Sequence, residues 1–135
     1  MRLTSELYFL VLVASATILM WIPYTLARIM TRGLMPALSN PDPSLPPDPA
    51  WVERARRAHG NAIENLAVFA PLVLIAALTG VSTPATVFAA KLYLIARLVH
   101  YCVYAAGVPV VRTLAFVVGA AATLVFAVTL LDRIA

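Results

Sequence analysis

Four long apolar runs restrict what this chain can fold into more than any other feature of its sequence. They extend approximately over residues 6–30, 51–78, 83–106 and 109–131, and each has about the 20 residues that a helix needs to cross roughly 30 Å of hydrocarbon. With 62% hydrophobic and only 12% charged residues, the chain departs far from the composition of soluble domains. Because lipid excludes open sheet edges and the runs lack strict alternation, we predict an all-α, four-helix transmembrane bundle that resides in a lipid bilayer.

The connections between the runs predict how these helices are ordered. Residues 31–50 hold six prolines and form the one long loop, which we expect to be extended and largely non-helical. The links TGVSTP and AAGVP are short, so neighbouring helices are expected to be antiparallel. We find no internal repeat and no second domain, and therefore predict a single membrane domain over residues 1–135.

Arginines distinguish the two sides of the predicted bundle. The first loop is flanked by Arg28, Arg32, Arg54, Arg56 and Arg57, and the third is bordered by Arg112. By the positive-inside rule these loops face the cytosol, and both termini lie outside. The same asymmetry accounts for the net charge of +4, so we predict no nucleic-acid partner. High Ala, Val and Arg content favours a bacterial inner membrane, while an endoplasmic reticulum location obeys the same topology rule.

Polar residues in the second run form a stripe along one side of the predicted helix. At 100° per residue, Arg54, Arg57, Asn61 and Glu64 fall within an arc of about 80°. Glu64 lies inside the apolar stretch, and ionisable groups at such depth usually face the bundle interior, pair with one another and mark a site. We therefore expect this stripe to face inward.

The third run carries a second polar stripe in the half that ends at the third loop. Its members Arg97, His100, Tyr101 and Tyr104 again share one helix face, and Arg112 opens the fourth helix. Hydrogen-bond donors gathered in a low-dielectric setting suit a small, charged, water-soluble ligand that meets a lipid-soluble one.

Two simpler interpretations of these residues stay open. Arg57 or Arg97 could form an ion pair with Glu64 that only fixes helix packing, and His100 alone is typical of a packing or hydrogen-bonding histidine. The single cysteine, Cys102, permits neither an internal disulfide nor a multi-cysteine metal site, so we predict no metal cofactor.

Two sequence blocks carry a resemblance to a known family. The segment ERARRAHGNAIENLAVFAPL resembles the signature of the membrane-associated proteins in eicosanoid and glutathione metabolism, which include microsomal glutathione transferases, leukotriene C4 synthase and microsomal prostaglandin E synthase. The pattern E-R-x-x-R-A-x-x-N-x-x-E is matched by Glu53, Arg54, Arg57, Ala58, Asn61 and Glu64. The second block is matched by Arg97, Tyr104 and Arg112, and the resemblance extends over nearly the whole chain.

The resemblance implies a homotrimer whose active sites lie between subunits near the cytosolic face. Glutathione would be the co-substrate, and a small lipophilic molecule would be its partner in the reaction. The residues implied in glutathione binding are Arg28 (or Arg32 in its place), Arg54, Arg57, Asn61, Glu64, Arg97, His100, Tyr101 and Tyr104. Arg112 matches the catalytic arginine credited with stabilising the thiolate. A cation beside a thiol with a pKa of about 8.5 lowers that pKa by about one to two units.

The expected function is therefore a glutathione-dependent membrane transferase or peroxidase. Because some members of the family bind lipid and regulate a partner without catalysis, a non-catalytic lipid-binding or regulatory protein is the alternative. An ion-coupled transporter is disfavoured, since Glu64 is crowded by arginines that would keep it ionised. The sequence does not specify which lipophilic substrate is used.

Overall fold

The computed structural model describes residues 3–133, and all regular structure within that range is helical. The helices are α1 (Ser5–Leu19), α2 (Trp21–Arg32), α3 (Leu34–Leu38), α4 (Ala50–Leu78), α5 (Pro84–Ala106) and α6 (Pro109–Leu131). Four stretches are long and apolar enough to cross a membrane, namely α1 with α2, α4, α5 and α6. The predicted all-α fold with four spans is thus confirmed.

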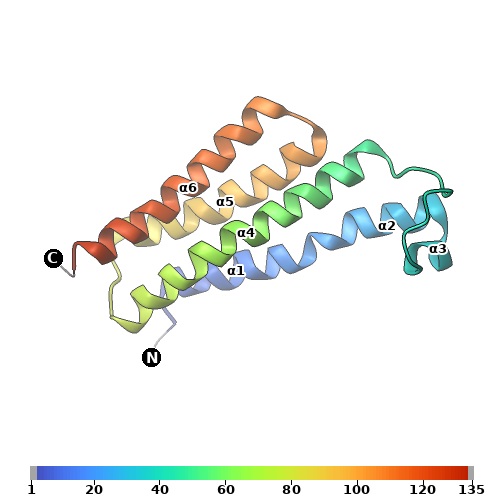
Figure 1. The fold of residues 1–135 in the computed structure, drawn as a ribbon. Helices are drawn as coiled ribbons and strands as arrows, with labels where there is room; N and C mark the ends of the chain where they lie inside the picture. The colour runs from blue at the N-terminus through green and yellow to red at the C-terminus, as the bar shows by residue number, and fades with distance from the viewer. Residues whose placement is uncertain (1–2, 134–135) are drawn as a thin grey trace.

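The four spans lie side by side, and consecutive spans run in opposite directions (Figure 1). The start of α1 and the end of α6 lie at one end of the bundle, while α3, the long loop and the turn between α5 and α6 lie at the other. Helix α5 is central to the packing, because it contacts α1, α4 and α6.

The first span is broken at Met20, although the sequence predicted one continuous helix. Pro23 has no N–H to donate to the carbonyl of Leu19, which weakens the helix at this point. The Met20 N–H instead bonds the carbonyl of Thr17 at 3.3 Å, and the hydroxyl of Tyr101 on α5 donates to the carbonyl of Met20 at 2.8 Å. A side chain from a neighbouring helix thus satisfies a backbone group at the break.

The long loop is non-helical over residues 39–49, as predicted, but it begins with the short helix α3 at residues 34–38, which was not predicted. Pro36 is tolerated there because it occupies the first helical turn, where backbone N–H groups have no intrahelical partner. Gly33 separates α2 from α3 with a φ of 85°, a conformation that glycine adopts without steric cost.

The interior of the bundle combines one aromatic cluster with small residues. The Phe69 and Tyr93 rings stack with centroids 3.7 Å apart, and Phe126 contacts Phe69 edge-on at 5.5 Å. Lipid provides little hydrophobic drive between helices, so close packing must stabilise the bundle. Small side chains allow that approach, and those buried on α4 and α5 include Ala55, Ala58, Ala62, Ala76, Ala89, Ala90 and Ala96.

Candidate functional site

One end of the bundle carries most of the positive charge. We call it the arginine-rich end, and its members are Arg28, Arg32, Arg54, Arg56, Arg57 and Arg112. It lies opposite the end where the described chain begins and finishes (Figure 1). The polar residues of α4 and α5 extend from this end into the bundle.

Arg97 is the most buried of the predicted site residues and faces the interior of the bundle. Only 1% of the residue is exposed, and its Nη2 donates to Oδ1 of Asn61 on α4 at 2.6 Å. The same Nη2 lies 3.4 Å from Nδ1 of His100. Within residues 3–133, its Nε and Nη1 have no hydrogen-bond partner. A guanidinium is therefore held between α4 and α5 with spare donors and no carboxylate beside it.

A cavity of about 220 Å³ opens beside this cluster, lined by His100, Tyr104, Arg112, Thr113 and Phe116. The Arg112 guanidinium carbon lies 4.4 Å from the centre of the Tyr104 ring, within the range of a cation–π contact. His100 packs edge-on against Tyr104 with ring centroids 5.5 Å apart. Three of the predicted site residues from α5 and α6 thus meet at one cavity.

Two other predicted site residues make structural contacts within their own chain. Arg54 donates from Nε to the carbonyl of Ala105 at 3.0 Å, where a cation is favourable because the helix dipole is negative at its C-terminus. The chain turns immediately afterwards at Gly107, which has a φ of 82°. Tyr101 is engaged at the break in the first span and lies off the cavity.

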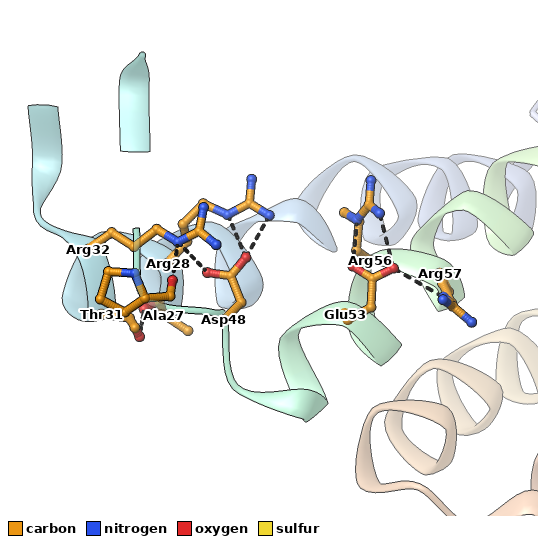
Figure 2. A network of polar contacts seen from close by, with 9 residues as sticks. Ala27, Arg28, Thr31, Arg32, Asp48, Glu53, Arg56 and Arg57 are labelled. Atoms are coloured by element: carbon orange, nitrogen blue, oxygen red, sulfur yellow. Dashed lines mark hydrogen bonds and ion pairs between the residues drawn. The ribbon is translucent and has the colours of Figure 1, made fainter. Parts of the chain in front are cut away.

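Arg57 and Glu64 are exposed, so the prediction that the whole α4 stripe faces inward is wrong for these two residues. Ala55, Ala58 and Ala62 mark the buried face of α4. At 100° per residue around the helix axis, the side chains of Arg57 and Glu64 lie about 130° or more from the centre of that face. Arg57 instead pairs with Glu53 at 3.1 Å, as does Arg56 at 3.0 Å (Figure 2). Within residues 3–133, Glu64 makes no hydrogen bond or ion pair, so the alternative in which it pairs with Arg57 or Arg97 to fix helix packing is not found there.

Arg28 and Arg32 hold the long loop against the end of α2. Asp48 accepts from Nη2 of Arg28 at 2.9 Å and lies 3.3 Å from Nε of Arg32, which also donates to the carbonyl of Pro46 at 2.9 Å (Figure 2). Within one chain Arg28 therefore serves the loop, and the cavity beside Arg112 is lined by other residues.

Comparison with known families decides the identity of this architecture. The model of the MAPEG family matches residues 7–131 of the 135-residue chain. The chain belongs to the MAPEG family. Its members include glutathione transferases and related proteins, some of them non-catalytic, and the resemblance found in the two sequence blocks is confirmed. A comparison with curated proteins gave no match.

Three residues at the arginine-rich end of this MAPEG protein were not identified as site residues from the sequence. Thr113 and Phe116 line the cavity. The position of Phe116, one helical turn after Arg112, could have indicated it, whereas no spacing rule indicates Thr113, which directly follows Arg112. Asp48 is one of two acids in a proline-rich segment, and no local pattern links it to two arginines about 20 residues earlier. Residues 3–133 of the MAPEG chain hold no group of three or more His, Cys, Asp or Glu side chains that could bind a metal ion.

Proposed function

We propose that this integral, multi-pass membrane protein is a glutathione-dependent transferase or peroxidase. The observation that carries the proposal is the position of Arg112, which the ring of Tyr104 supports at 4.4 Å beside the cavity. The cation adjoins His100 there, and polar contacts continue inward to Arg97 and Asn61. The site therefore combines a cation near the surface with a deeper row of hydrogen-bonding groups, which suits a small peptide with charged ends.

The charges of the site match those of glutathione. The tripeptide has two carboxylates, one ammonium group and amide groups, and arginine is the preferred partner of carboxylates. We assign carboxylate binding to Arg57 and Arg97, amide recognition to Asn61, and ammonium binding to Glu64. His100 and Tyr104 complete the wall on the α5 side, while Arg54 and Tyr101 support it through their backbone contacts.

The role of Arg112 is to increase the fraction of reactive thiolate. A thiol with a pKa of about 8.5 is about 3% ionised at pH 7, and a shift of 1.5 units raises that fraction to about 50%. In a transferase step the sulfur forms a bond to an electrophilic carbon while the bond to the leaving group breaks. In a peroxidase step it takes one oxygen from a hydroperoxide, leaving an alcohol, and a second glutathione then yields the disulfide and water.

A second copy of the chain would complete the site. The cavity of about 220 Å³ is smaller than the roughly 300–1,000 Å³ typical of ligand pockets. Glu64 is exposed on a membrane-spanning helix, and an acid facing lipid there is costly. We propose that a homotrimer covers Glu64 and Arg57 at a subunit interface, where Arg28 of the neighbouring copy also approaches the ligand.

The positions of the arginines support an orientation for the assembly. Six arginines gather at the arginine-rich end, and cations near membrane spans favour the cytosolic side. We therefore propose that the first and third loops face the cytosol, where glutathione is supplied, and that both termini face outward. A lipophilic second substrate would enter from the bilayer, and composition favours a bacterial inner membrane.

Glutathione binding and thiolate formation test the proposal together. The purified protein, in detergent, is titrated with glutathione by calorimetry while the thiolate absorbance is followed in the ultraviolet. Arg112→Gln is expected to reduce or abolish the thiolate band. The matched control Arg56→Gln removes an exposed arginine that only pairs with Glu53, and it is expected to behave as wild type.

Each other outcome counts against a defined part of the proposal. Binding with no thiolate difference between wild type and Arg112→Gln would overturn the role of Arg112. No binding at millimolar glutathione would overturn the catalytic proposal, and lipid binding in the same preparation would then favour the non-catalytic, lipid-binding member of the family.

A further inference from the structure

The short helix α3 presents an apolar surface that the fold leaves uncovered. Its sequence LMPAL has no charged or hydrogen-bonding side chain. Met35 is 74% exposed and Leu38 71% exposed, and Met30, just before α3, is 87% exposed. Its main packing partner among the helices is α2, and most of the surface of these three side chains is left open.

This surface is held in a fixed place. The N–H of Gly33 bonds the carbonyl of Ile29 at 2.8 Å, and the N–H of Ala37 bonds the carbonyl of Gly33 at 3.2 Å. On the far side of the loop, Asp48 ties residues 46–48 back to α2 through Arg28 and Arg32. These bonds hold α3 in one position relative to α2, so its exposed apolar side chains form a surface of defined location.

The level of α3 along the bundle indicates what covers it. It begins two residues after Arg32, which ends the first span, and it lies at the arginine-rich end with the long loop (Figure 1). Exposed apolar side chains continue from α2, at Leu26 and Met30, onto α3. Leu26 and Met30 belong to a stretch long and apolar enough to cross a membrane, so lipid would cover them, and the apolar α3 surface follows them directly along the chain.

We propose that α3 is a membrane-surface helix, whose apolar side chains insert between the headgroups and acyl chains of the adjacent leaflet. Segments that lie at this depth bury apolar side chains in the boundary layer, while cations on neighbouring segments meet anionic lipid. The exposed Arg56, near the start of α4 at the same end, provides such a cation. The first loop thereby lies on the membrane surface, on the side where a lipophilic substrate would pass from the bilayer into the site.

The opposite part of the same loop offers a matched control position. Ser44 is exposed, and its hydroxyl donates to the Asp42 carboxylate at 2.7 Å. Hydrogen bonds from the Ser44 side chain and backbone lower the pKa of Asp42, so this carboxylate is charged at neutral pH. Residue 44 is therefore expected to lie in water while residue 35 lies in lipid.

Depth-dependent fluorescence quenching tests the proposal in the full chain. The exposed Cys102 is first replaced by serine, and Met35→Cys or Ser44→Cys is then introduced and labelled with an environment-sensitive fluorophore. Each protein is reconstituted in vesicles of phosphatidylcholine and phosphatidylglycerol. Gel filtration and thermal unfolding before labelling verify that both variants keep the parent fold.

The label at residue 35 is expected to emit at shorter wavelength and to be quenched several times more by lipids with a headgroup nitroxide than by aqueous iodide. The label at residue 44 is expected to show the reverse. Equal iodide quenching at both positions would overturn the proposal, because α3 would then lie in water. A blue-shifted label at residue 35 that neither agent quenches would also overturn it, since another protein copy would then cover the helix.

Discussion

Replacing Asn61 with leucine tests whether the buried Arg97 guanidinium depends on a partner from the adjacent helix. The Nη2 to Oδ1 distance is 2.6 Å, which is short even for a charge-assisted hydrogen bond. With 1% of Arg97 exposed and two of its nitrogens unpartnered within residues 3–133, loss of this acceptor leaves only the contact with His100 at 3.4 Å.

The expected loss of stability follows from the free energies that comparable hydrogen bonds contribute in water-soluble proteins and in membrane proteins. A hydrogen bond to a charged group contributes about 1.5–3 kcal/mol in water-soluble proteins. Interhelical hydrogen bonds in a membrane protein average about 0.6 kcal/mol and reach about 1.7 kcal/mol. Because this one is short, charged and buried, we expect Asn61→Leu to lower the free energy of unfolding by about 1.5 kcal/mol.

The assay is reversible unfolding in mixed micelles, with dodecyl sulfate as denaturant and circular dichroism as the readout. Protein concentration is kept constant, because self-association would make stability concentration-dependent. Asn65→Leu is the matched control, since Asn65 bonds only Asn61 of its own helix, at 2.8 and 3.3 Å. Asn61→Asp restores a strong acceptor and is expected to remain as stable as wild type.

A double-mutant cycle assigns the effect to the pair. Arg97→Met removes the cation, and the double variant Asn61→Leu with Arg97→Met is expected to show a coupling free energy of about 1 kcal/mol or more. The reasoning is refuted if Asn61→Leu unfolds like wild type, if Asn65→Leu costs as much, or if the cycle shows additive losses.

Four further substitutions probe the packing and the backbone with the same unfolding measurement. Phe69→Ala removes a fully buried ring that stacks on Tyr93 and contacts Phe126 edge-on, and it should cost about 3–5 kcal/mol. A loss below about 1 kcal/mol would mean that the cluster is loosely packed. Tyr101→Phe deletes the hydrogen bond to the carbonyl of Met20 and should cost about 0.5–1.5 kcal/mol, whereas an unchanged midpoint would show that the break needs no partner. Gly107→Ala forces a φ of 82° on alanine and should destabilise the protein by about 1 kcal/mol. Gly60 lies inside α4, and an added Cβ would meet open space. Gly60→Ala should therefore stabilise the protein by about 0.5–1 kcal/mol.

The spans could be predicted because one physical constraint dominates them. Hydrocarbon thickness fixes their length, and the Gly and Pro residues at the links fix their ends. The break at Met20 has a local signal in Pro23, but proline is also tolerated in continuous membrane helices, as at Pro71 in α4. The sequence alone therefore did not decide between a bend and a break.

The site was predicted in part because helical periodicity gives relative directions only. Asn61, Arg97, His100, Tyr104 and Arg112 were grouped from spacing, and they lie in or beside one polar cluster. The absolute rotation of each helix depends on which small residues pack, so the outward position of Glu64 could not be read from the sequence. Contacts that a second copy would make are likewise beyond the pattern of one chain.

The partnership of Arg97 with Asn61 also bears on how the chain enters the membrane. Helix α5 is the least apolar of the four spans and carries both Lys91 and Arg97. On the scale for insertion by the translocon, a single arginine or lysine at the centre of a helix costs about 2.5–3.5 kcal/mol. Because α4 is synthesised first and provides the acceptor for Arg97, α5 is expected to leave the translocon alongside α4. Biogenesis of this small protein thus couples two helices that a hydropathy profile treats as independent.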